Sequence, residues 1–284
     1  MSFRLGRGIC ARLLFLCICL AAVQSARAET SLERGAYLMN GIVACGNCHT
    51  QQTLDGPLEG MELAGGMSIE FPDFTAITPN ITPDPETGIG TWTDQQIIDA
   101  IREGRRPDGT IIGPPMPIEL YRHISDDDIR AIVAYLRAVK PIRNAVAKST
   151  YSFPLPPSYG PPAGAVPAVS RDDKVAYGAY LAGPLGHCIE CHSPTGPTGA
   201  PDVEHQLGAG GFEIYGPWGI SVSANITPAA LADWTDDQIK TVITTGIRPD
   251  GSRLMPPMGV HYYKNITPED QDAIVAYLRT LPPK

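Results

Sequence analysis

Apolar residues recur at helical spacing in two identical stretches, one near the end of each half of the chain. The sequence Ala-Ile-Val-Ala-Tyr-Leu-Arg stands at 131–137 and again at 273–279. In both copies large apolar side chains return every three or four positions, which is typical of one buried helix face. Ser125 and Thr267 stand before these stretches, are followed by acidic residues, and suit N-caps. The pattern therefore predicts a closing helix in each half.

The rest of the chain repeats as well. Thr93 and Thr235 are each followed three residues later by Gln, which predicts capping boxes at the start of a middle helix. Gly104 and Gly246 suit the ends of these helices. Further matching segments are 32–38 with 175–181, 65–66 with 210–211, 80–83 with 225–228, and 106–109 with 248–251. No stretch shows sustained strand alternation, so we expect an all-α fold of two tandem helical bundles.

Composition divides the chain into four segments. Residues 141–170 contain seven prolines and few large apolar side chains, which predicts an extended connector. Residues 1–28 have a basic start, a short apolar run and a final Ala-Arg-Ala, which predicts a bacterial signal peptide cleaved before Glu29. A retained membrane anchor is the alternative, and the apolar run is too short for it. The two predicted domains are 29–140 and 171–284.

Removal of the signal peptide changes the charge and the cysteine count. The number of Lys and Arg falls from 22 to 18 against 30 Asp and Glu, so the formal charge falls from −8 to −12. So acidic a chain is not expected to bind nucleic acid. It favours a partner with a positive patch, although the charge also serves solubility. Four cysteines remain: Cys45, Cys48, Cys188 and Cys191.

These cysteines form two C-x-x-C-H motifs, at 45–49 and 188–192. The motif attaches c-type haem covalently through both thiols, and the following His becomes the proximal iron ligand. The alternatives are a zinc knuckle and a dithiol redox pair. Zinc would need four ligands at each site, and a dithiol pair would not need His in both copies. We therefore predict two covalent haem c groups, with His49 and His192 as proximal ligands and no thiol left for a disulfide.

The distal ligands are predicted from a second repeated unit. Pro-Pro-Met occurs at 114–116 and at 256–258, after an Arg-Pro-Asp-Gly turn in each half. Aligning the units places Met116 opposite Met258, whereas Met255 falls opposite a glycine and is the weaker candidate. A Met on the distal side of a His-ligated iron raises its reduction potential. Packing of these methionines in a core is the alternative.

Other residues could also approach the haem groups. Tyr37 and Tyr180 repeat between the halves, and we expect them near a haem edge or in the core. Arg106 and Arg248 also repeat, and could contact haem propionates or form a salt bridge within their turns. The remaining histidines have no counterpart in the other half and are expected to be surface or hydrogen-bonding residues: His123, His187, His205 and His261.

Both halves resemble class I cytochrome c domains, with a first helix, C-x-x-C-H, a distal Met loop and a closing helix. The stretch at 80–94, with Arg-Arg-Pro-Asp-Gly and Pro-Pro-Met, is similar to cytochrome c subunits of bacterial periplasmic dehydrogenases for alcohol, gluconate, sorbitol or aldehyde. Such subunits typically carry three haem groups and a C-terminal membrane-binding segment. This chain has two motifs, a departure that counts against direct quinone reduction at the membrane.

The resemblance implies an electron-transfer protein of the periplasm with no catalytic residue of its own and no transmembrane anchor after signal cleavage. A dehydrogenase would donate electrons, and another cytochrome, an oxidase or the quinone pool would accept them. The alternative is a di-haem enzyme, such as a peroxidase or a thiosulfate dehydrogenase-like protein. Such an enzyme needs an open or unusually ligated haem. The matching Pro-Pro-Met units argue against it.

Overall fold

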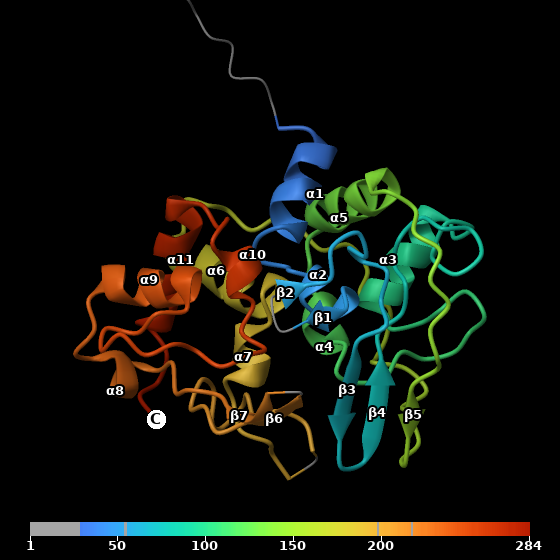
Figure 1. Cartoon of the computed structure of the whole chain (residues 1–284). Coiled ribbons are helices and arrows are strands. Elements are labelled where there is room, and N and C mark those ends of the chain that lie inside the picture. The colour runs from blue at the N-terminus through green and yellow to red at the C-terminus, as the bar shows by residue number, and fades with distance from the viewer. Residues whose placement is uncertain (1–28, 54–55, 198, 217) are drawn as a thin grey trace, which may run out of the picture.

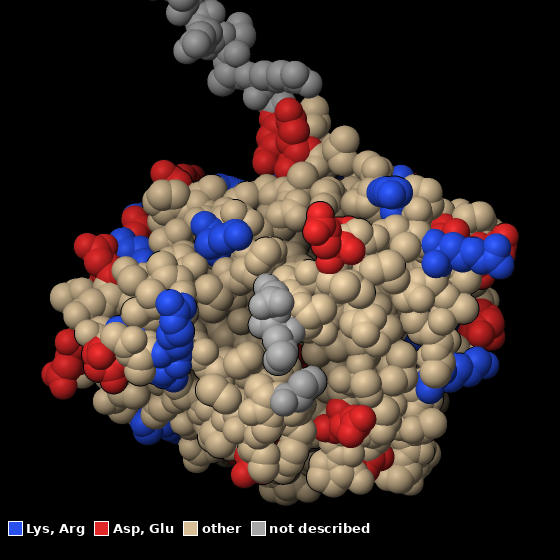
Figure 2. All heavy atoms as spheres, viewed as in Figure 1, with Lys and Arg blue, Asp and Glu red and all other residues tan. Residues whose placement is uncertain are grey.

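The computed structural model describes residues 29–53, 56–197, 199–216 and 218–284. The predicted signal peptide at 1–28 lies outside these residues. Within the described ranges, no helix is both long and apolar enough to cross a membrane. On the face seen in Figure 2, acidic and basic side chains are interspersed and form no continuous basic stripe.

The two halves have closely similar element orders. The first half contains α1 (Ser31–Met39), α2 (Gly46–His49), β1 (Gln52–Thr53), β2 (Gly56–Pro57), β3 (Ser68–Phe71), β4 (Phe74–Ile77), α3 (Asp94–Arg102), α4 (Ile118–Tyr121) and α5 (Asp126–Ala138). The second contains α6 (Lys174–Tyr180), the π-helix η1 (Leu181–Leu185), α7 (Cys188–Cys191), β6 (Glu213–Gly216), β7 (Gly219–Val222), α8 (Pro228–Leu231), α9 (Asp236–Thr245), α10 (Val260–Tyr263) and α11 (Pro268–Leu278). The strand β5 (Thr150–Tyr151) lies between the halves in sequence.

The predicted helix starts are confirmed. Thr93 and Thr235 form capping boxes at the first residues of α3 and α9. Ser125 and Thr267 cap α5 and α11 by accepting a hydrogen bond from the backbone N–H three residues on. Each cap satisfies an N–H that has no partner within the helix, so these helix starts are fixed by local sequence.

The prediction of an all-α fold is wrong. Of the described residues, 33% are helical and 12% are in strands or bridges, and the strands form three small antiparallel sheets. Hairpins β3–β4 and β6–β7 lie between the predicted helices, in stretches whose sequence shows no sustained strand alternation. A four-residue strand places only two side chains on each face, so its alternation is too short to be recognised in the sequence.

A close helix pair forms the centre of each half. Helix α1 packs on α5, and α6 packs on α11. A Cβ on Gly35 would lie 2.0 Å from the carbonyl oxygen of Ala131, and one on Gly178 would lie 1.9 Å from that of Ala273. Glycine is needed at both positions because any larger residue would push the helices apart.

The two halves lie side by side, with their hairpins next to each other at the lower edge of the molecule (Figure 1). Strand β3 contacts β6. The ring of Phe71 lies 6.2 Å from that of Phe212 and 5.9 Å from that of Tyr215, measured between centroids. Aromatic packing thus joins the two hairpins across the interface.

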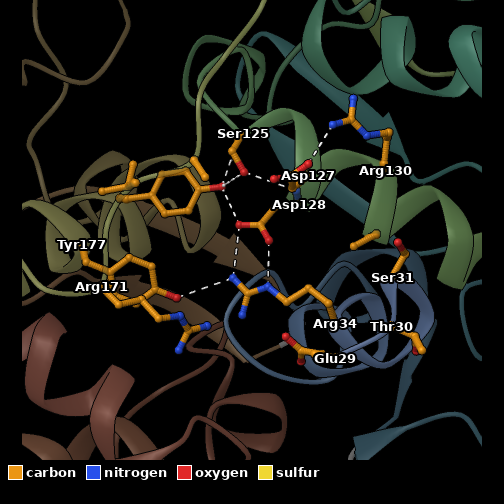
Figure 3. A pocket seen from close by; sticks show the side chains of 14 residues that line it. Glu29, Thr30, Ser31, Arg34, Ser125, Asp127, Asp128, Arg130, Arg171 and Tyr177 are labelled. Atoms are coloured by element: carbon orange, nitrogen blue, oxygen red, sulfur yellow. Dashed lines mark hydrogen bonds and ion pairs between the residues drawn. The ribbon is translucent and has the colours of Figure 1, made fainter. Parts of the chain in front are cut away.

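Two tyrosines join the upper part of the interface. Tyr180, at the end of α6, donates to Asp128 at 2.7 Å and accepts from the backbone N–H of Ser125 at 3.0 Å. Arg34 also holds Asp128, at 2.7 Å, and this cluster lines a pocket between the halves (Figure 3). Tyr37, in α1, donates to Asp270 at 2.7 Å. Each tyrosine therefore binds the first turn of the other half's closing helix.

Residues 142–166, here called the belt, run along the first half. Strand β5 adds to the free edge of β4. The hydroxyl of Tyr151 donates to the carbonyl oxygen of Pro114 at 2.9 Å, and that of Tyr159 donates to that of Ile112 at 2.7 Å. The belt therefore covers the loop that leads to Met116.

Candidate haem sites

Each C-x-x-C-H motif forms a single helical turn, α2 or α7. The residue before the first cysteine has a left-handed backbone in both motifs, with φ of 47° at Ala44 and 40° at His187. This conformation is rare for residues other than glycine and is often found at functional positions. Its presence in both copies is a feature of the sites that the sequence did not reveal.

The imidazoles of His49 and His192 are held in the same way. Nδ1 of His49 lies 2.9 Å from the carbonyl oxygen of Pro79, and Nδ1 of His192 lies 2.6 Å from that of Ala224. A carbonyl oxygen only accepts, so Nδ1 carries the hydrogen and the lone pair of Nε2 is left for a metal. Burial lowers the pKa of both imidazoles, which favours their neutral form. A proximal iron ligand needs both properties.

The repeated Asn-Ile-Thr triplets order the loops behind these imidazoles. The side-chain oxygen of Asn80 accepts from the backbone N–H of Thr82 at 2.9 Å, and that of Asn225 accepts from Thr227 at 2.8 Å. Each turn directly follows the carbonyl group that binds Nδ1. A local side-chain turn thus fixes the orientation of each imidazole.

The surroundings of the four cysteine thiols disfavour the thiolate form. Burial raises the pKa of Cys45 to about 12 and that of Cys188 to about 11. Such surroundings suit neutral thioether sulfur better than the thiolates of a zinc site. Among the described residues, only His187, Glu190 and Cys191 bring three possible ligand atoms within 4.8 Å of one another. The four thiols therefore do not converge on one metal ion, and the residues fit a haem at each motif.

Both candidate distal methionines are partly buried against the hydrophobic core. Met116 precedes α4 and Met258 precedes α10, and each backbone carbonyl oxygen accepts from the N–H two residues on, at 2.8 Å. Met255 is instead 49% exposed. The two Pro-Pro-Met loops therefore have the same backbone turn at the methionine, as their alignment predicts.

Two buried tyrosines near the thiols were missed in the sequence. Tyr121 and Tyr263 close α4 and α10. Burial raises the pKa of each well above its usual value, and neighbouring thiols raise it further. Cys45 and Cys48 act on Tyr121 in this way. The repeat in the sequence could have revealed them, because Tyr121 and Tyr263 are separated by the same interval as Met116 and Met258.

The other repeated residues make contacts within the protein. Tyr180 belongs to the hydrophobic core and Tyr37 packs against it, in agreement with one of the two expectations. Tyr37 and Tyr180 cross the interface, as described above. The guanidinium groups of Arg106 and Arg248 donate to backbone carbonyl groups of their own turns, at 3.0 Å and 2.8 Å. They therefore order the turns that lead to the methionine loops. His205 forms a surface pair with Asp202 at 3.0 Å.

The two methionine loops differ in what covers them. Gly113 lies under the belt, where a Cβ would be 2.6 Å from the Tyr151 ring. Its counterpart is the exposed Met255. On β7, which corresponds to β4, Ile220 is 57% and Val222 is 60% exposed. In the part of the chain that the structure describes, no strand pairs with the outer edge of β7.

Comparison with known proteins identifies the family. The model of the family "Cytochrome C oxidase, cbb3-type, subunit III" matches twice, at residues 30–136 and 175–278. The chain belongs to this family. The matches cover the same two stretches as the repeat, and membership of a cytochrome c family makes the chain a haem c protein.

Named relatives agree with the expected resemblance. The chain is 32% identical over 93% of its length to the cytochrome c subunit of the quinone alcohol dehydrogenase of Gluconacetobacter polyoxogenes. It is 29% identical to the gluconate 2-dehydrogenase cytochrome c subunit of Pantoea cypripedii, over 92% of its length and 62% of that subunit. It is 30% identical to a diheme c-type cytochrome of Cereibacter sphaeroides, over 84% of this chain and 82% of that one. The chain spans 58% of the length of the alcohol dehydrogenase subunit.

Proposed function

We propose that the chain is a periplasmic di-haem cytochrome c that relays electrons from a dehydrogenase toward the respiratory chain. The observation that carries the proposal is the duplicated motif in which each His holds its Nδ1 on a backbone carbonyl group, at 2.9 Å and 2.6 Å. The repeat supports two haem domains, at 29–140 and 171–284, joined by residues 141–170.

The proposed ligands follow from the repeat. Cys45 and Cys48 would attach one haem and Cys188 and Cys191 the other. His49 with Met116, and His192 with Met258, would bind the two irons. A haem bound at each motif would supply the one-electron redox chemistry.

The chain's own residues would tune and protect the two sites. The carbonyl groups of Pro79 and Ala224 orient the imidazoles and increase their basicity as ligands. The buried helix pairs and tyrosines keep water away, which favours the less charged ferrous state. Because both sites have the same proposed iron ligands, we expect neither to be specialised for catalysis.

The partners are inferred from the relatives. Several are cytochrome subunits of dehydrogenases, which supports a periplasmic dehydrogenase as the electron donor. The acceptor would be another cytochrome, an oxidase or a quinone-linked carrier. The predicted signal peptide supports export, and the protein would work in the periplasm, free or at the membrane surface.

The test is an absorption spectrum of the purified mature protein, ferric and ferrous, with and without carbon monoxide. Haem is quantified per chain in the same sample. We expect two low-spin haem groups, a ferric Met–iron charge-transfer band and no carbon monoxide binding. Binding of carbon monoxide to one haem in two would show an open iron and would favour a di-haem enzyme such as a peroxidase.

A further inference from the structure

The two C-x-x-C-H motifs differ at the positions between the cysteines. The first has Gly46 and Asn47, and the second has Ile189 and Glu190. The side-chain amide of Asn47 donates to the carbonyl oxygen of Pro257 at 2.8 Å, although 210 residues separate them. Pro257 immediately precedes Met258, so the first motif is bonded to the methionine loop of the second half.

Gly46 provides a second contact with the same loop. A Cβ at Gly46 would lie 2.2 Å from the hydroxyl oxygen of Tyr262. Tyr262 belongs to α10, which begins two residues after Met258. The first motif therefore meets the chain on both sides of Met258, and glycine is required for the tyrosine to approach.

The second motif makes no equivalent hydrogen bond to the methionine loop of the first half, among the described residues. The carboxylate of Glu190, which corresponds to Asn47, lies 3.6 Å from Nδ1 of His187 in its own half. Leu120 stands where the second half has Tyr262. Among the hydrogen bonds of the described residues, none joins Glu190 to the loop of Met116.

We propose that Asn47 is a positioning residue for the second haem, because it holds the Met258 loop from the first half. The inference rests on the proposed role of Met258 as distal ligand. A hydrogen bond to a backbone carbonyl group is worth about 1 kcal/mol, or about a fivefold change in an equilibrium. Loss of the bond should favour release of Met258 by that factor and leave Met116 unaffected.

The experiment uses the full-length holoprotein and isolates one methionine at a time. In a Met116→Leu background, the remaining ferric Met–iron band reports on Met258 alone. Adding Asn47→Leu should lower by about fivefold the imidazole concentration that removes half of this band. In a Met258→Leu background, Asn47→Leu should leave the imidazole titration of the Met116 band unchanged. The Met258→Leu background is thus the matched control for the effect of Asn47→Leu.

The outcomes separate the inference from the proposed function. If Met258→Leu removes no part of the band, the ligand assignment is wrong. If it removes half, yet Asn47→Leu does not alter the titration of Met258, Asn47 does not position the loop. Haem content is measured for every variant. If Asn47→Leu reduces the haem content below two per chain, Asn47→Asp, which keeps the shape but lacks the donor, is titrated in its place. Asn47→Gln keeps an amide donor, so its imidazole concentration should lie between those of the Asn47→Asp variant and the parent.

Discussion

At the scale of single residues, the imidazole orientation is the most informative feature of the structure. Each proximal candidate directs its Nδ1 hydrogen at a carbonyl group, and each carbonyl group directly precedes an Asx turn. The same three-part arrangement in both halves argues that both are built to present Nε2 to a metal. Because the two proximal sides match, a difference between the sites can be attributed to Met116 and Met258 on the proposed distal sides.

The first prediction concerns the methionines. Met116→Leu and Met258→Leu should each remove about half of the ferric Met–iron band and open one iron to carbon monoxide, because leucine fills the space without a ligand atom. Met255→Leu is the control and should change neither. Absorption spectra with haem quantification decide this. Loss of the band in the Met255 variant would mean that the loops are aligned wrongly.

At the scale of elements, the close crossing of α6 and α11 depends on Gly178. The variant Gly178→Ala would bring a Cβ within 1.9 Å of the carbonyl oxygen of Ala273. We expect a loss of about 3 kcal/mol in the free energy of unfolding, since the helices must separate. Urea unfolding of the holoprotein, followed by circular dichroism, measures this.

Gly183→Ala is the matched control, in the π-helix that follows α6. A Cβ there would have ordinary contact, with Cδ1 of Ile189 at 3.7 Å. The variant should stay within about 1 kcal/mol of the parent. If Gly183→Ala lowered the free energy of unfolding as much as Gly178→Ala does, the close crossing of α6 and α11 would not be the cause of the loss.

The belt gives another prediction at this scale. Tyr151→Phe and Tyr159→Phe each remove one hydrogen bond to the chain that leads to Met116. Each should lower the free energy of unfolding by about 1 kcal/mol and speed proteolysis within residues 142–166. Tyr215→Phe, whose hydroxyl bonds the exposed Glu213, should change stability by no more than about 0.5 kcal/mol. A comparable cost for all three would refute a specific role for the belt.

At the scale of the whole molecule, Tyr37 and Tyr180 make the association of the halves sensitive to alkaline pH. Burial and the hydrogen bond to Asp270 raise the pKa of Tyr37 to about 12, and burial beside Asp128 raises that of Tyr180. An unfolded tyrosine has a pKa of about 10. The unfolded chain therefore loses these protons first as pH rises, so the stability is full below pH 10 and falls as pH approaches 12.

The measurement is urea unfolding between pH 9 and about 11.5. The double variant Tyr37→Phe and Tyr180→Phe should be less stable at pH 9 by about 1–3 kcal/mol per site, because Asp128 and Asp270 lose a partner. Its stability should also fall less steeply with pH than that of the parent. An unchanged slope would show that other tyrosines cause the alkaline loss.

The sequence by itself determined the features that depend on neighbours along the chain. Haem attachment is predicted from five consecutive residues, and the helix starts at Thr93, Ser125 and their counterparts follow from caps within three residues. The repeat predicted which residues correspond. Short hairpins such as β3–β4 were missed, because two side chains per face leave too weak a pattern.

Only the tertiary structure decided which residues of one half contact the other half. Tyr37 reaches Asp270 over 233 residues, and Asn47 reaches Pro257 over 210. Such contacts depend on how two folded surfaces meet, and neither periodicity nor caps record that. The belt likewise covers one methionine loop and leaves the exposed Met255 beside the other. Two sites with the same proposed ligands thus acquire different surroundings, through the residues that differ between the halves and through the way the halves pack.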